Sequence, residues 1–196
     1  MISRAHSRVL LFLLCGVLPV GCSAGPSSPA TGGASEVSPS PQAATQEEAR
    51  RQLRIGYDAF NKQDLDSAMS CANETLRLDT KADPALTAKA LVLRSLVYNL
   101  RKDHDRAVAE ATEAIRAKED APYAYFARAR AYEWKEQYQK AADDLTKAIT
   151  LTPEGPQQAG YYEFRAKCHQ ALGEPDKARQ DERRAQELSK ASAKGS

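Results

Sequence analysis

The sequence lacks the motifs of several common enzyme classes. It contains neither a Gly-rich phosphate-binding loop nor a nucleophile elbow of the G-x-S-x-G type. His104 and His169 each stand without a Cys or His at the spacing of a metal site. The adjacent acids Asp143 and Asp144 would point about 100° apart on a helix, too divergent to share a proton. We therefore predict no catalytic residue, no cofactor and no metal, and that the chain is not an enzyme.

The chain also lacks a strong charge of either sign. Its formal net charge is +2 at pH 7, from 28 basic and 26 acidic residues. Two of the basic residues, Arg4 and Arg8, lie in residues 1–22, which hold no acid, so removal of that segment would leave 26 of each sign. Binding to a phosphate backbone would then have no bulk electrostatic driving force. We predict no nucleic-acid partner.

Cysteine is scarce, with four in 196 residues. Cys15 lies in the apolar amino-terminal segment and Cys22 at its end, which leaves Cys71 and Cys168 for the folded part. The repeat register described below puts these two in the first and last repeats. Because a disulfide requires Cα atoms within about 7 Å, we expect two free, mostly buried thiols and no intramolecular bridge.

The amino terminus has the layout of a secretion signal. Arg4, His6 and Arg8 precede an apolar run of about a dozen residues, from Val9 to Val20. This run is too short to span a bilayer. Residues 1–21 are therefore predicted to be a signal peptide.

The end of that run, Leu18-Pro19-Val20-Gly21-Cys22, resembles the bacterial lipoprotein signal. The resemblance implies that Cys22 receives a diacylglyceryl group and becomes the first residue of the mature protein. Pro19 departs from the pattern, because that family usually has Leu three residues before the Cys. The alternative is ordinary cleavage near Ala24 and release of a soluble secreted protein.

Residues 22–45 are predicted to be a disordered linker after the lipidated Cys. The stretch from Ser23 to Thr45 is rich in Ser, Pro, Ala, Gly and Thr and has no apolar period. A flexible coil of this length spans about 25 to 30 Å. The linker would thus hold a domain just clear of a membrane surface.

Two amphipathic helices are predicted within residues 122–153. On a 3.6-residue period Tyr125, Ala129 and Tyr132 share one face, and after a polar break Ala141 and Leu145 share another. Small residues stand where the two backbones must approach, and bulky ones where volume has to be filled. This order, closed by a Pro, resembles the tetratricopeptide repeat.

The same signature recurs along the chain. Ala68, Ala107, Ala141 and Ala178 occupy one slot, at spacings of 39, 34 and 37 residues. We predict a domain over residues 46–190 and a disordered tail over 191–196. The four predicted repeats cover about 49–82, 88–121, 122–155 and 159–191. The resemblance implies an all-α fold: an α-solenoid of four antiparallel helix pairs that forms a right-handed superhelix with a concave inner face.

Three arginines fall in equivalent positions of successive repeats: Arg94, Arg128 and Arg165. Guanidinium groups at repeat spacing suit an anion-binding surface. The alternative, which we favour, is a set of ion pairs between repeats, with Glu110 serving Arg128 and Asp144 serving Arg165. Arg94 would face Cys71 and have no acidic partner.

The concave face is predicted to bind a partner. First-helix residues that point away from the packed stripe form an apolar and aromatic surface that becomes charged in the last repeat, which suits an extended or helical peptide with hydrophobic anchors. The alternative is that tight curvature buries some of these side chains. The predicted groove residues are Leu53, Tyr57, Phe60, Leu96, Asn99, Tyr123, Phe126, Arg130, Trp134 and Lys167.

One known ligand of the repeat family is not indicated. In that family, Lys, Asn and Arg side chains hold the C-terminal carboxylate of cytosolic heat-shock chaperones. The matching positions of this sequence hold other residues: Leu53, Tyr57, Leu93, Tyr123 and Ala127.

The sequence thus predicts an exported, non-enzymatic scaffold for protein interactions. It would be anchored through Cys22 as a cell-envelope lipoprotein and would bind a protein or peptide in its groove. By resemblance, small lipoproteins with these repeats act as envelope assembly factors. The alternatives are an accessory subunit that recruits and regulates a cell-wall enzyme, and a soluble secreted repeat protein.

Overall fold

A computed structural model of the chain describes residues 40–79 and 83–194. The predicted signal peptide, Cys22 and most of the predicted linker lie outside these residues. Eight helices make up the described part: α1 (Pro41–Asn61), α2 (Leu65–Asp79), α3 (Pro84–Leu100), α4 (His104–Ala117), α5 (Pro122–Trp134), α6 (Tyr138–Leu151), α7 (Pro156–Ala171) and α8 (Pro175–Lys194).

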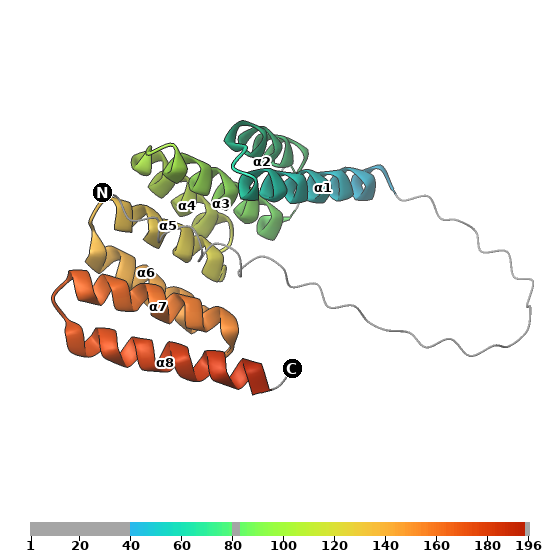
Figure 1. Ribbon diagram of the computed structural model, residues 1–196. Coiled ribbons are helices and arrows are strands. Elements are labelled where there is room, and N and C mark those ends of the chain that lie inside the picture. The colour runs from blue at the N-terminus through green and yellow to red at the C-terminus, as the bar shows by residue number, and fades with distance from the viewer. Residues whose placement is uncertain (1–39, 80–82, 195–196) are drawn as a thin grey trace, which may run out of the picture. The chain divides into compact units, whose positions relative to one another are not determined.

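Consecutive helices pack as four antiparallel pairs (Figure 1). The pairs are α1 with α2, α3 with α4, α5 with α6, and α7 with α8, and the second helix of each pair contacts the first helix of the next. The first helices α1, α3 and α5 also contact one another in turn. The predicted all-α solenoid of four helix pairs is confirmed for the described residues.

The four anchor alanines occupy equivalent positions. Ala68, Ala107, Ala141 and Ala178 are each the fourth residue of the second helix of a pair, and each is at most 1% exposed. A methyl group at this point lets the two backbones approach closely and still excludes water. The repeat register inferred from these residues is confirmed.

The turn inside each pair is built the same way four times. Gln63, Lys102, Glu136 and Gly173 lie five residues before the anchor alanines and have φ of 64°, 64°, 56° and 75°. The next amide donates to a carbonyl five residues earlier, as in the bond from Gln137 N to Tyr132 O at 2.9 Å. This is the Schellman arrangement, which satisfies carbonyls left free at a helix end. Only the fourth repeat uses glycine, which adopts positive φ without strain.

Some element boundaries differ from the prediction. Helix α1 begins at Pro41, inside the predicted linker, because the Ser40 hydroxyl accepts from Ala43 N at 3.2 Å and Pro41 suits the first helical turn. Helices α3 and α7 likewise begin at prolines, ahead of the predicted repeat starts. Helix α8 extends to Lys194, into the predicted tail.

Both cysteines of the described residues are free, as predicted. Cys71 is half-buried, whereas Cys168 is 1% exposed. Burial raises the pKa of the Cys168 thiol to about 12, with a further contribution from Glu133. This thiol is therefore protonated at neutral pH and acts as a small apolar group in the core.

Candidate interaction surface

The structure places three of the ten predicted groove residues in the core. Leu53, Phe60 and Asn99 are 6%, 4% and 6% exposed. Leu53 and Phe60 belong to the apolar cluster between the first two helix pairs. These three side chains therefore do not form an open surface, and the alternative of burial holds for them: Leu53 and Phe60 pack with residues of α2 and α3, and Asn99 contacts His104 of α4.

Two tyrosine hydroxyls link the first three repeats by hydrogen bonds. The hydroxyl of Tyr57 in α1 donates to the Lys89 carbonyl at 3.1 Å, and that of Tyr123 in α5 donates to the Ala85 carbonyl at 3.4 Å. Both acceptors belong to α3, so this helix is held from both sides. Burial raises the pKa of Tyr57, and burial with nearby Asp120 raises that of Tyr123 to about 12. The two hydroxyls therefore serve as neutral structural donors.

The space between α5 and α7 is filled by aromatic rings. The Phe126 centroid lies 5.3 Å from that of Tyr161 and 5.8 Å from that of Phe164. The Arg130 guanidinium lies 6.0 Å from the Phe126 centroid. Burial lowers the pKa of Arg130, and the neighbouring Glu133 partly opposes this. Phe126 and Arg130 are thus half-buried residues at the edge of a packed cluster.

The accessible part of the predicted groove lies over α3, α5 and α7. Trp134 is 54% exposed, Lys167 is exposed and Leu96 is half-buried. Leu100, beside the predicted residues, is 47% exposed. The candidate surface is therefore narrower than the sequence indicated.

A ladder of half-buried ion pairs runs through the last three repeats. Arg128 Nε and Nη2 both donate to Asp144, at 2.8 Å each, and Arg165 Nε and Nη2 donate to Asp181 at 2.8 and 2.7 Å. Arg94 donates once to Glu110, at 2.6 Å. In every case the acid follows the arginine by 16 residues, inside the same helix pair.

This geometry corrects the predicted partners. The predicted pairs Glu110 with Arg128 and Asp144 with Arg165 do not form, and Arg94 does have an acidic partner. The acid of each second helix faces the first helix of its own pair. The prediction had paired it with the first helix of the next pair. Asp181 was missed altogether, although the constant spacing of 16 residues would have found it.

Threonine hydroxyls supply the contact between repeats. Arg128 Nη1 donates to Thr112 at 3.4 Å, and Arg165 Nη1 donates to Thr146 at 2.9 Å, each from the preceding second helix. Both guanidinium groups are thereby occupied by carboxylate and hydroxyl oxygens. The anion-binding interpretation of the arginine stripe is not supported.

Comparison with known proteins agrees with this architecture. Residues 122–154 match the family model described as tetratricopeptide repeat. The protein has the tetratricopeptide-repeat (TPR) fold. No curated protein matches the chain.

Several solved structures share the TPR fold. One is MamA, with a TM-score of 0.62 and 18% identity over 77% of this chain and 84% of that one. Another is a thermophilic TPR protein of Thermus thermophilus, with a TM-score of 0.61 and 18% identity over 71% and 74%. The TPR domain of Arabidopsis OM64 gives 0.55 and 19% identity over 64% and 98%. At these identities the likeness establishes the fold alone.

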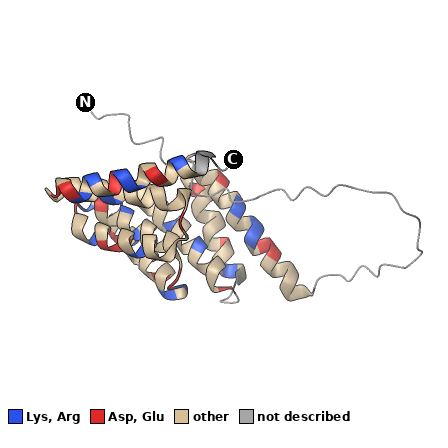
Figure 2. Cartoon of the chain, turned by 90° about the horizontal axis from the view of Figure 1, so that it is seen from below, with Lys and Arg blue, Asp and Glu red and all other residues tan. Residues whose placement is uncertain are grey.

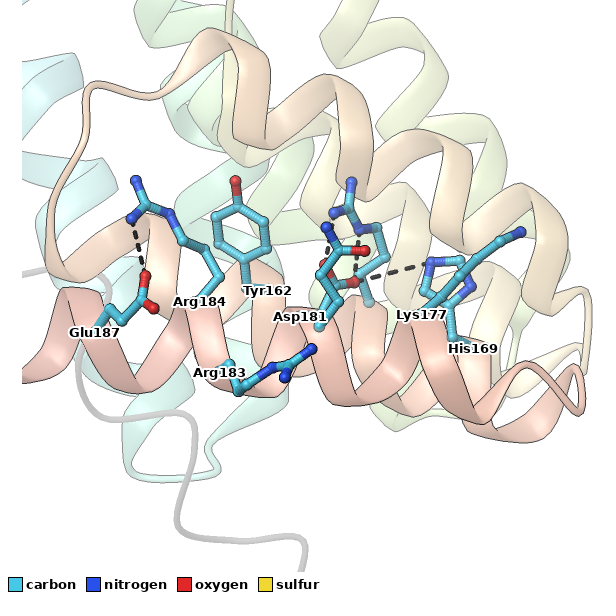
Figure 3. A pocket seen from close by; sticks show the side chains of 9 residues that line it. Tyr162, His169, Lys177, Asp181, Arg183, Arg184 and Glu187 are labelled. Atoms are coloured by element: carbon cyan, nitrogen blue, oxygen red, sulfur yellow. Dashed lines mark hydrogen bonds and ion pairs between the residues drawn. The ribbon is translucent and has the colours of Figure 1, made fainter.

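A second candidate site of the TPR fold is an open cleft of about 790 Å³ between α7 and α8 (Figure 3). Most of its charged side chains are paired: Arg165 with Asp181, Arg184 with Glu187 at 3.1 Å, and Lys177 with Glu174 at 2.8 Å. His169 joins the same network, with Nδ1 2.7 Å from Glu174 Oε2. Arg165 and Asp181 pair across the cleft, so these two charges contribute to the contact between α7 and α8.

Other site classes find no support in the described part of the TPR fold. Among residues 40–79 and 83–194, no three His, Cys, Asp or Glu side chains gather as a metal site. None of the helices described there combines the length and apolarity needed to cross a membrane. Figure 2 shows basic and acidic residues interspersed along the described helices.

Proposed function

We propose that the protein is a non-enzymatic scaffold that binds a segment of another protein on the concave face of its TPR fold. The observation that carries this proposal is the surface over α3, α5 and α7. There Trp134 and Leu100 are about half exposed, on first helices that hydrogen bonds from Tyr57 and Tyr123 link to α3. Exposed apolar groups on a preformed surface favour association, because little ordering is lost on binding.

Photo-crosslinking tests this function. A benzophenone amino acid in place of Lys167 would lie on the proposed surface, and the same residue in place of Lys147, exposed on α6, serves as the matched control. We expect irradiation in cells to give one defined protein adduct from position 167 and none from position 147. Equal adducts at both positions, or none at 167, would contradict the proposal.

The proposed setting is the bacterial cell envelope, with the protein held there by an acyl group on Cys22. This part is supported by the sequence of the first 22 residues, which resembles a lipoprotein signal. Two acyl chains give stable membrane attachment, whereas a single chain does not.

The Cys22→Ser variant tests that setting. We expect the wild-type protein in the detergent phase after phase partitioning and the variant in the aqueous phase. A variant that stays in the detergent phase would show that Cys22 does not anchor the protein, and wild-type protein in the aqueous phase would leave the soluble secreted alternative.

A further inference from the structure

Arg130 differs from the other half-buried arginines of the protein. Five arginines among residues 40–79 and 83–194 are half-buried. Four of them pair with an acid: Arg94, Arg128, Arg165 and Arg184. Arg130 forms neither a hydrogen bond nor an ion pair within the described part of the chain. Because a guanidinium group withdrawn from water needs acceptors for its N–H groups, this exception calls for an explanation.

The surroundings of Arg130 supply aromatic rings and no acceptor. Its guanidinium carbon lies 6.0 Å from the Phe126 centroid, and Phe126 packs against Tyr161 and Phe164 of α7. A cation beside a ring keeps its outer N–H groups available. Burial lowers the pKa of Arg130, and the charge of Glu133 only partly opposes this. The position therefore disfavours the cation until an anion joins it.

A second cation lies level with Arg130 on the neighbouring helix. Helices α5 and α7 both pack against α6 and run in the same direction. Arg130 follows Phe126 by about one helical turn, as Lys167 follows Phe164, and the two rings lie 5.8 Å apart. Glu133 acts electrostatically on Arg130 and on the thiol next to Lys167. With two cations and one acid, this region carries a net positive charge.

The shape of the guanidinium group selects an oxyanion as the ligand. The chain itself shows the match, because Arg128 Nε and Nη2 each donate to the Asp144 carboxylate at 2.8 Å. Carboxylate and phosphate groups both accept two parallel bonds from an arginine. A half-buried setting beside aromatic rings strengthens such bonds, because less water competes for the donors.

We propose that Arg130 and Lys167, here called the Arg130 site, bind a carboxylate or phosphate group. Two N–H groups of Arg130 donate to two oxygens of that anion, and Lys167 adds positive charge at the edge of the site. The binding of an oxyanion is independent of the scaffold function. The further step, that a partner protein carries the anion, rests on that function.

Acetate and phosphate serve as the two probes. Each sodium salt is titrated into the full chain at constant ionic strength, made up with sodium chloride, and the arginine Nε–H signals are followed by nitrogen-15 NMR. The Arg130 signal, assigned by its loss in Arg130→Met, should shift to saturation with at least one probe. Saturation with acetate identifies a carboxylate ligand, and saturation with phosphate alone identifies a phosphate ligand.

Substitution of Arg130 tests the paired bonds. Arg130→Met keeps the length of the side chain, and the dissociation constant obtained from backbone amide shifts of α5 and α7 should rise more than about tenfold. Arg130→Lys should recover only part of the affinity, because an ammonium group lacks the planar fork. The matched control is Arg54→Met, at an exposed arginine of α1 that has no ion pair within the described residues. It should leave the dissociation constant unchanged.

A purely structural role of Arg130 would appear in the stability of the protein. Arg130→Met removes no hydrogen bond of the described residues, so the urea midpoint of unfolding should stay the same or rise. Arg94→Met removes the bond to Glu110 and should lower the midpoint. A fall for Arg130→Met as large as that for Arg94→Met would show that Arg130 serves the fold, and would overturn the proposed role.

Two further outcomes would overturn the Arg130 site: no shift of the Arg130 signal with either probe, or equal effects of Arg130→Met and Arg54→Met on binding. An adduct from position 167 alongside either outcome would leave the scaffold function standing. Arginine-dependent anion binding without that adduct would keep the Arg130 site and remove the scaffold function.

Discussion

The second repeat pairs its arginine with an acid less completely than the third and fourth repeats do. Arg94, Arg128 and Arg165 hold the same slot, and each faces an acid 16 residues later. The two aspartates accept a two-bond fork from their arginines, whereas Glu110 accepts one bond. Nε of Arg94 is buried without a partner. Carboxylates of equal charge thus differ in how well they match the guanidinium fork.

The difference extends to the neighbouring repeat. Thr112 and Thr146 accept from Arg128 and Arg165, and the equivalent position before Arg94 is Asn73, which is exposed. Asp181 and Asp144 are deeply buried, so their charge is tolerated only because the paired bonds replace water. A buried ion pair therefore helps in proportion to the hydrogen bonds that complete it.

Asp144→Ala should lower the unfolding free energy more than the other substitutions discussed here. It leaves the half-buried Arg128 guanidinium without its carboxylate, which costs up to about 3 kcal/mol of unfolding free energy. Urea unfolding followed by circular dichroism would measure the change. The adjacent Asp143→Ala removes an exposed acid and should change stability by less than about 0.5 kcal/mol. Equal losses would show that the pairing does not stabilise the fold.

The pH dependence of the unfolding free energy should show that Arg94 and Glu110 form the weaker ion pair. Burial raises the pKa of its carboxyl above the ordinary value, and Arg94 only partly offsets this. The folded state therefore holds the Glu110 proton more tightly than the unfolded state does. Stability from this group must fall as pH rises through the window just above the ordinary glutamate value of 4.5.

Glu110→Gln is expected to remove that fall. The free energy of unfolding of wild type minus that of the variant, measured in urea across this window, should decrease as pH rises. A difference that increases with pH would mean that Arg94 outweighs burial and that the second repeat is as well paired as the others.

The repeat register could be read from the sequence because it depends on volume at one slot. Ala68 and its three equivalents must be small whatever surrounds them, so a period in the sequence is enough to find them. The ion-pair partners could not be read with the same certainty. Whether the acid of a second helix faces its own first helix or the next one depends on how the helices cross, which the residue types do not determine.

The candidate surface was harder to predict for a related reason. Tyr57 and Phe126 are aromatic residues of the kind found at binding surfaces. The Tyr57 hydroxyl instead donates to a carbonyl of α3, and the Phe126 ring packs against Tyr161. Aromatic side chains suit a core and an interface equally well. Curvature between neighbouring repeats decides which role each one takes, and curvature is a property of the assembled stack.

The smallest predicted effect comes from a substitution that would give Arg94 of the second repeat its missing hydroxyl acceptor. Asn73→Thr places a hydroxyl at the position where Thr112 and Thr146 accept from an arginine. If Arg94 uses it, the free energy of unfolding should rise by about 0.5 kcal/mol, the lower end for one hydrogen bond. Asn73→Val matches threonine in shape without the hydroxyl and should give no such gain.

A double-mutant cycle with Arg94→Met separates this contact from other effects of the substitution. The gain from Asn73→Thr should disappear once the guanidinium is gone, because methionine has no donor for the hydroxyl. A gain that persists would come from helix propensity or packing. In that case the missing threonine would not explain why Arg94 is less well paired than Arg128 and Arg165.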